Sequence, residues 1–456
     1  MTSLANTKIT YDDKVSMRKS FGRYVSQNIF AMVGLSCYVL VDTFFIANGI
    51  GNEGITILNL CLPIFNFIAA IGSMIAAGSA IEFAVAKAEG DKRKDNYFYN
   101  AVFFATVFGI IVMLLGLFAP AEILRLMGGR GEMVTKGIPY IRTFMFFGPT
   151  LVVNYTVNAF VRNDGEPTLA MISTIAGSLF NIVFDYIFVF PLHMGMFGAA
   201  LATAFSPFVE MGICMIHFKS EKNNIRFLWK KPSILRAFNS CRIGVASFIG
   251  EFASGITITI FNYMILSISG NIGVAAYGII ANLAIVGVAI CNGVSSGNQP
   301  LISHKYGERK MQDCKYLLKL GIVCVLVLAL IMYAIVVIWV DGIVALFNKE
   351  NSEVLYGYAR DGLIIYFVGF FFAGLNAIFS GYFSAMVKPK QAFVISMLRG
   401  IILIGLFAVL LGTLFGMNGV WLSFPAAEFV TFVVSIILYI YTSQERNDSF
   451  VVEESN

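Results

Sequence analysis

Four polar side chains stand inside apolar stretches of this sequence and could bind a cation. Asp185 and Asn181 lie in LFNIVFDYIFVFPL (179–192), Asp42 lies in VLVDTFFIANG and Thr203 in GAALATAFSP. Asn181 and Asp185 are four residues apart, so a helix projects both from one face. A carboxylate costs at least about 3 kcal/mol at the centre of a membrane helix. We expect such a group to persist only where it meets a cavity, a cation or a proton.

These four side chains offer two kinds of chemistry. Two carboxylates, an amide oxygen and a hydroxyl are hard oxygen ligands that suit Na⁺. Alternatively, Asp42 and Asp185 form a like-charge pair in which one member keeps a proton near neutral pH. A non-functional alternative is that each aspartate bonds to neighbouring backbone, or that Asp42 reaches interfacial water. We favour a functional role, because intramembrane ionisable groups usually have one.

Other acidic residues are further candidates. Glu251, in FIGEFASGI, lies in the seventh apolar stretch, which is the counterpart of the first, and it is a second candidate for a cation site. Glu210 and Glu428 each follow a proline by three residues, and pairing with lysine or arginine is as good an explanation for them as transport. The histidines lack the spacing of metal ligands, so no metal site is expected beyond Na⁺ at the four residues above.

The elements that carry these residues are apolar helices. Of 456 residues, 58% are hydrophobic and 13% charged, which is typical of a membrane protein. A hydrocarbon layer of about 30 Å needs roughly 20 apolar residues per helix. The sequence therefore predicts an all-α integral membrane protein with about twelve spans, near 24–47, 55–82, 98–118, 138–161, 169–190, 195–218, 243–268, 272–298, 317–340, 361–386, 392–415 and 419–442.

The distribution of charge predicts the topology. Basic residues crowd 87–96, 218–242 and 304–315, while most intervening loops contain none. The positive-inside rule then places both termini in the cytoplasm, in a multi-pass protein of the cytoplasmic (inner) membrane. Beside membrane helices, these basic stretches are interpreted as topology determinants, so nucleic acid is not an expected partner. The seven cysteines form no CxxC pair and are expected to be free thiols.

The two halves of the chain resemble each other. AKAEGDKRK after the second span is echoed by SHKYGERKM after the eighth, and MGMFGAAL before the sixth by FGMNGVWL before the twelfth, at offsets of about 217 to 222 residues. We predict two pseudo-symmetric six-helix bundles, 1–217 and 243–456, joined by a cytoplasmic linker, 218–242. Two such bundles, related by an axis along the membrane normal, enclose a central cleft.

Motifs for enzymatic chemistry are absent from the sequence. It contains no GxxxxGK[ST] or HExxH, so we expect neither an enzyme nor a cofactor, and the energy source would be a gradient of H⁺ or Na⁺. The 43 phenylalanines and 19 methionines are mostly packing residues. A minority of them lining the cleft would suit amphipathic ligands, since such surfaces adapt to different shapes.

Across essentially the whole chain, the sequence resembles the multidrug and toxic compound extrusion (MATE) family, in its DinF/MepA-like branch. The resemblance rests on the two six-span repeats and on Thr203 in the sixth span, together with four motifs: VDTFFIANGIG, LNLCLPIFNF, AEGDKRK and NIVFD. It implies the MATE fold and cation-coupled antiport, in which H⁺ or Na⁺ enters and drives export of organic cations and other drugs by alternating access.

The resemblance also implies roles for individual residues. The cation site of this branch maps onto Asp42, Asn181, Asp185 and Thr203, with Tyr140 in a supporting network; Asn158 falls near the drug cavity. NorM-like members place acids in the seventh and tenth spans. Glu251 matches the first of these, but the tenth span contains no acid beyond Asp361 at its outer edge.

Two other functions compete with drug export. A lipid-linked precursor flippase of the same superfamily would have 14 spans and a cationic cleft, whereas this sequence has about twelve spans and acidic candidates. A membrane receptor or scaffold would transport nothing, and no segment resembles a soluble signalling domain. The expected partners are therefore amphipathic drugs or organic cations and the lipid bilayer, and we expect a monomer.

Overall fold

The structure is a computed structural model that describes residues 11–226, 231–348 and 352–454. It is built of helices. Within these ranges there is no strand, as predicted for an all-α protein. The elements are α1 (Tyr11–Gly49), α2 (Asn52–Ala88), α3 (Lys94–Phe118), α4 (Pro120–Leu126), α5 (Glu132–Phe146), α6 (Gly148–Asn163), α7 (Pro167–Val189), α8 (Gly195–Cys214), a 3₁₀ turn (Met215–Lys219), α9 (Ile234–Gly307), α10 (Met311–Phe347), α11 (Glu353–Ala385), α12 (Pro389–Met397), a π-helical segment (Leu398–Ile402) and α13 (Leu403–Glu454).

The helices coincide with the predicted spans, although several spans share one helix. By length and apolar composition, nine of the described helices can cross a membrane, or ten if the pair α5 and α6, bent by 45°, is one span. α9 and α13 each contain one glycine with left-handed φ, Gly270 (63°) and Gly416 (60°), which falls between two predicted spans. The total of twelve spans therefore stays a prediction.

Helix ends differ from the predicted boundaries. α1 begins at Tyr11, well before the span predicted from residue 24, because helical hydrogen bonding continues through polar residues that a count of apolar residues leaves out. α9 begins at Ile234, inside the predicted linker 218–242, of which residues 227–230 lie outside the described residues. All seven cysteines are free thiols.

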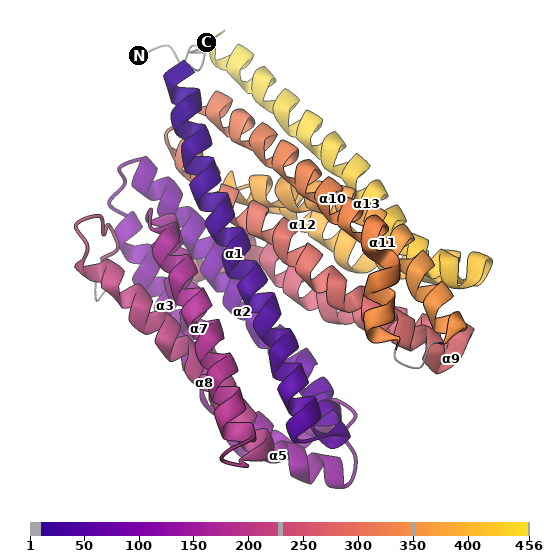
Figure 1. The fold of residues 1–456 in the computed structure, drawn as a ribbon. Helices are drawn as coiled ribbons and strands as arrows, with labels where there is room; N and C mark the ends of the chain where they lie inside the picture. The colour runs from indigo at the N-terminus through magenta and orange to yellow at the C-terminus, as the bar shows by residue number, and fades with distance from the viewer. Residues whose placement is uncertain (1–10, 227–230, 349–351, 455–456) are drawn as a thin grey trace.

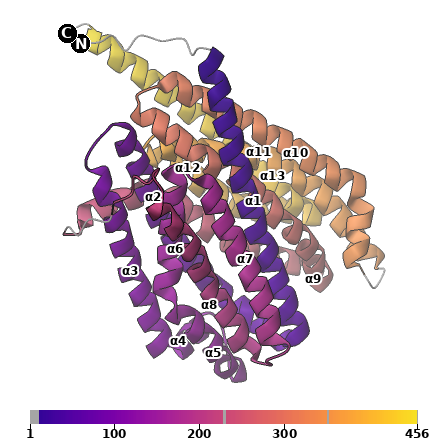
Figure 2. The same ribbon diagram turned by 60° about the vertical axis from the view of Figure 1, so that its left-hand side comes forward.

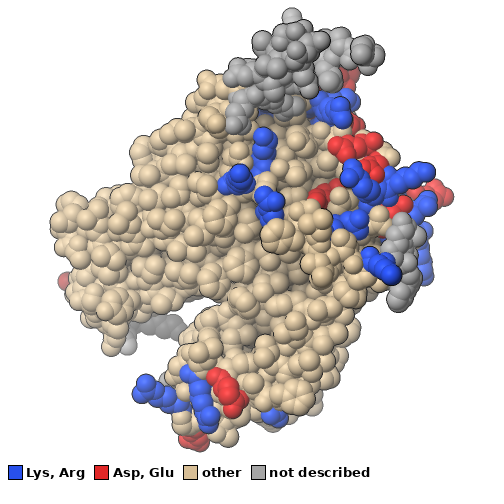
Figure 3. Space-filling model, turned by 180° about the vertical axis from the view of Figure 1, so that it is seen from behind, with Lys and Arg blue, Asp and Glu red and all other residues tan. Residues whose placement is uncertain are grey.

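The helices form two groups, α1 to α8 and α9 to α13, which Figures 1 and 2 show in indigo to magenta and in rose to yellow. The groups lie together at the end where α1 begins and α13 ends, which we call the terminal end, and diverge toward the opposite, open end (Figure 1). Figure 3 shows a hollow between the two groups, and charged side chains gathered near the two ends with a broad uncharged belt between them. Such a belt fits a bilayer.

Glycines bring the two bundles into backbone contact toward the terminal end. A Cβ on Gly244 of α9 would lie 2.0 Å from the carbonyl oxygen of Met74 in α2, and one on Gly78 would lie 1.8 Å from that of Ser240. The Ser240 hydroxyl also donates a hydrogen bond to Glu82. The helices can approach this closely only because neither glycine has a side chain.

Candidate cation site

Close packing of α1 against α7 brings Asp42 to Asp185. The two helices run parallel, and at their ends Gly49 allows a contact in which an added Cβ would lie 2.2 Å from Cγ1 of Val189. In this register the carboxyl groups of Asp42 and Asp185 lie within hydrogen-bonding reach of each other. The structure thus places together two acids that are 143 residues apart in the sequence.

Asn181 of α7 and Thr203 of α8 add an amide and a hydroxyl to the two acids. In the orientation that satisfies both ends of its amide, Asn181 donates to Oδ2 of Asp185 at 2.9 Å and accepts from the Thr203 hydroxyl at 3.3 Å. The Thr203 hydroxyl also lies 3.1 Å from the carbonyl oxygen of Ala199. All four predicted ligands, Asp42, Asn181, Asp185 and Thr203, therefore gather in one cluster inside the N-terminal bundle.

Among the residues that the structure describes, the negative charge of this cluster has no fixed counterion. Asp185 and Asn181 are fully buried, Asp42 is 9% exposed, and one carboxylate oxygen of each aspartate receives no hydrogen bond. Within the described residues neither aspartate has an ion pair with lysine or arginine. Burying such a charge is costly unless a proton or a cation neutralises it. The cluster can therefore hold a proton between two carboxyl groups or a small cation among its oxygens.

Tyr140 lies beside the cluster, whereas Asn158 does not. Tyr140 of α5 is 1% exposed, its ring packs 5.8 Å from that of Phe65, and it interacts electrostatically with both Asp42 and Asp185. Asn158 of α6 instead donates to the backbone and hydroxyls of α7, at Ala170, Ser173 and Thr174. The structure thus places Asn158 between two helices of the N-terminal bundle, and its role at a drug cavity stays a prediction.

Glu251 lies apart from this cluster, in the C-terminal bundle. It is an exposed residue of α9, and its charge acts on Tyr155 of α6 in the other bundle. One residue further, Phe252 packs against Phe67 of α2 with ring centroids 6.5 Å apart. Glu251 therefore lies where the two bundles face each other, and its assignment as a second cation site stays a prediction.

The sequence did not distinguish Glu210 from Glu428, but their surroundings differ. Glu428 is buried in an ion pair with Arg399, whose Nη2 lies 2.9 Å from Oε1. Glu210 has no such pair among the described residues and accepts a hydrogen bond from the Asn154 amide at 2.9 Å. Both glutamates follow a proline by three residues, so the sequence around them is alike. Only the contacts with neighbouring helices show that one glutamate has a cationic partner and the other has none among the described residues.

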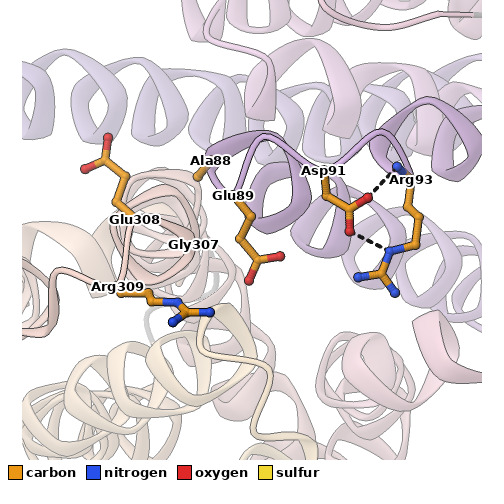
Figure 4. A pocket seen from close by; sticks show the side chains of 7 residues that line it. All are labelled: Ala88, Glu89, Asp91, Arg93, Gly307, Glu308 and Arg309. Carbon is orange, nitrogen blue, oxygen red and sulfur yellow. Dashed lines mark hydrogen bonds and ion pairs between the residues drawn. The ribbon is translucent and has the colours of Figure 1, made fainter. Parts of the chain in front are cut away.

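A separate, charged pocket lies at the terminal end, where the loops after α2 and α9 meet (Figure 4). Glu89 and Arg309 extend into the space between the loops, Glu308 points away from it, and Asp91 pairs with Arg93 at 2.5 Å. These loops are the AEGDKRK and YGERK segments of the predicted repeat. The pocket is remote from the Asp42–Asp185 pair, and it lacks the apolar lining that an amphipathic ligand needs.

Comparison with known proteins identifies the family. The MatE family model matches residues 28–187 and 247–410, once in each predicted half. The chain belongs to the MATE family. The multidrug export protein MepA of Staphylococcus saprophyticus is 24% identical over 446 residues, which cover 97% of this chain and 98% of MepA. MepA of Staphylococcus haemolyticus is 26% identical over 406 residues, covering 88% and 89%.

Solved structures of MATE transporters share this fold. The outward-facing conformation of a multidrug resistance MATE family transporter of the MOP superfamily aligns with a TM-score of 0.88, covering 94% of this chain and 97% of that one at 22% identity. The predicted MATE fold, formed by a multi-pass membrane protein, is therefore confirmed, and so is the predicted family.

Proposed function

We propose that this MATE protein is an antiporter that exports amphipathic organic cations and drugs in exchange for H⁺ or Na⁺. The relatives named multidrug export protein support export of drugs. We place the protein in the cytoplasmic membrane with its terminal end in the cytoplasm and propose that it acts as a monomer. The hollow between the bundles is the proposed route of the substrate, opened alternately to the two sides.

The observation that carries the proposal is the uncompensated pair of Asp42 and Asp185. Two adjacent buried carboxylates repel each other, so binding of H⁺ or Na⁺ stabilises the arrangement of α1 against α7 that holds them together. When the ion leaves, that arrangement becomes unfavourable. Differential ion affinity of two conformations is the thermodynamic requirement for coupling an ion gradient to transport.

The experiment is ethidium export from vesicles under imposed gradients. We expect efflux to follow either a Na⁺ gradient at fixed pH or a pH gradient without Na⁺, which also identifies the coupling ion. Asp185→Asn and Asp42→Asn should each nearly abolish export. Glu53→Gln, which alters an exposed acid paired with Lys136 at the open end, is the matched control and should export normally. Wild-type rates in both aspartate variants would remove the mechanism.

A further inference from the structure

The polar face of α7 continues beyond the candidate cation site toward the terminal end. Ser173, Gly177, Asn181 and Asp185 recur every four residues and are all buried. Each step of four residues advances about 6 Å, so Gly177 lies about 12 Å along α7 from Asp185. A Cβ on Gly177 would lie 2.4 Å from Cγ of Glu210, which places Glu210 directly against this face.

Within the described part of the chain, Glu210 has polar neighbours but no fixed cation. Asn154 donates to its Oε2, and the Asn154 oxygen is buried without a donor. Its charge acts on three titratable groups, which are Tyr38 of α1, Tyr155 of α6 and Cys214 of its own helix. α7 faces it with Gly177. In the described structure, therefore, Glu210 has no partner that neutralises its charge.

Tyr38 connects Glu210 to the candidate cation site. It lies four residues before Asp42 on the same face of α1. Its hydroxyl interacts electrostatically with Asp42, Glu210 and Asp185 together. Tyr38 therefore lies within electrostatic range of both the Asp42–Asp185 pair and Glu210.

The C-terminal bundle contains the same arrangement with one difference. Asn376 donates to Glu428 Oε2 at 2.7 Å, as Asn154 donates to Glu210 Oε2 at 2.9 Å. In the C-terminal bundle, Glu428 also forms an ion pair with Arg399, whose Nη2 lies 2.9 Å from Oε1. The repeated loops EPTLA and KPKQA are offset by 222 residues, and the same offset relates Arg399 to Gly177. The N-terminal bundle thus has glycine where the C-terminal bundle has the arginine that neutralises its glutamate.

We propose that Glu210 is a second proton-binding residue of the N-terminal bundle, oriented by Asn154. A bound proton neutralises Glu210 as the Arg399 guanidinium neutralises Glu428 in the C-terminal bundle. The inference rests on the proposed function and extends it. In net terms the Asp42–Asp185 pair loses one proton and Glu210 gains one, about 12 Å away along α7. The pair thereby gains the negative charge that Glu210 loses. This transfer makes the pair ready to bind the next ion.

The test counts protons on the purified full-length protein. Infrared titration measures the band of protonated carboxyl groups, and a pH indicator in weakly buffered solution counts protons released when ethidium binds. We expect Glu210→Gln to lower both, while Asn154→Ala shifts the midpoint of the carboxyl titration. Gln keeps the size of Glu210 and can still accept from Asn154, so the fold should be retained. Glu428→Gln is the matched control and should leave both proton counts per folded molecule unchanged.

The outcomes separate this inference from the proposed function. If Glu210→Gln keeps the wild-type carboxyl band and proton release, the inference is overturned, although ion-driven export can still hold. A loss of bound ²²Na⁺ in Glu210→Gln without loss of protons also overturns it, because Glu210 would then bind Na⁺. If the wild type exports nothing under either gradient, the proposed function fails. The infrared titration still decides whether Glu210 binds a proton, because it does not depend on transport.

Discussion

At the scale of single residues, the buried acids fall into two classes. Glu428 and Asp164 have cationic partners, Arg399 and Lys87 respectively, within 3 Å. Asp42 and Asp185, which are also buried, and Glu210, which is half-buried, have none among the described residues. A buried acid with a fixed cation contributes to structure, since removing one partner leaves the other charge buried and unpaired. An acid without one is a candidate for binding a mobile ion, and this separates candidates for coupling from structural pairs.

Asp164 provides a test of the structural class. It lies in the loop between α6 and α7, where its carboxylate accepts from Lys87 at 2.5 Å and from the backbone of Asn224 at 2.7 Å, and lies 2.8 Å from Nε2 of His217. Burial raises its pKa, but the hydrogen bonds from His217, Lys87 and Asn224 outweigh burial and leave the pKa below its ordinary value. We predict that Asp164→Asn destabilises the fold by about 3 kcal/mol at pH 7.

The pH dependence of this effect has a definite sign. Because the folded-state pKa is lowered, the stabilisation is complete above the ordinary aspartate pKa of about 4 and is lost as pH falls through the folded value. The unfolding temperatures of the wild type and of Asp164→Asn should therefore become equal only in acid. Asp91→Asn, which removes an exposed pair with Arg93, is the control and should change little at any pH. Equal unfolding of wild type and Asp164→Asn at pH 7 would contradict the assignment.

Spacing within one helix is what made part of the candidate site predictable. Asn181 and Asp185 share a face because they are four residues apart, and their position inside apolar stretches grouped them with Asp42 and Thr203. Nothing in the sequence around Glu210 and Glu428 separates them, because the partner of each comes from a different helix. Tyr38 was missed for the same reason: its link to Glu210 exists only once α1 and α8 are packed.

At the scale of helices, register decides which residues meet. The lengths of the apolar stretches predicted where the helices run, but not which residues of neighbouring helices meet. α7 and α8 pack antiparallel, in a register in which Asn181 faces Thr203 and Ser173 faces Cys214. Pro207 lacks an N–H, so the Thr203 carbonyl has no helical partner there and accepts from the Ser206 hydroxyl at 3.2 Å. Such registers depend on side-chain fit between helices, which a single sequence does not display.

The register of α1 against α7 can be tested at two glycines. An added Cβ at Gly49 would lie 2.2 Å from Cγ1 of Val189, a buried β-branched side chain, whereas one at Gly34 would make an ordinary contact of 3.6 Å with Ile175. We predict that Gly49→Ala costs about 1–3 kcal/mol through overpacking. It should also lower ion-driven export, because the substitution forces apart the helices that carry Asp42 and Asp185.

Gly34→Ala is the matched control for this prediction. Alanine is the better helix former, so this variant should be as stable as wild type or more so, with normal export. Thermal unfolding in detergent and ethidium efflux from vesicles measure the two effects. Normal efflux in Gly49→Ala would show that the approach of α1 to α7 is not needed to bring the two aspartates together.

At the scale of the whole molecule, the bundles meet toward the terminal end and diverge at the open end (Figures 1 and 2). Besides the contact of α2 with α9, Gly293 and Gly297 of α9 face α1, where an added Cβ would lie 2.7 Å from Cα of Ile29 and of Val25. The internal repeat predicted two bundles and a cleft between them. It did not predict which end of the cleft is closed, because that depends on how the bundles pack against each other. Glycine spacing alone does not reveal that choice, since glycines are common throughout membrane helices.

Closure of the terminal end can be tested through Gly244. A valine there would collide with the backbone of Met74, at 2.0 Å, so α2 and α9 must separate at a cost of about 1–3 kcal/mol to this conformation. Cys241, one turn before Gly244, is half-buried against the core of the N-terminal bundle. We predict that Gly244→Val raises the rate of N-ethylmaleimide labelling at Cys241 several-fold, with exposed Cys37 as the internal reference.

Gly250→Val separates opening of the bundles from general loosening. An added Cβ at Gly250 meets nothing within 4 Å, so this variant introduces the same side chain into the same helix without a collision. Labelling resolved by peptide mass spectrometry should therefore rise at Cys241 in Gly244→Val and stay at the wild-type rate in Gly250→Val. If both variants label faster, or neither does, the glycine contact between α2 and α9 does not control access to the terminal end. In that case, closure would depend on the other contacts between the bundles, with α1 against Gly293 and Gly297 as the next to test.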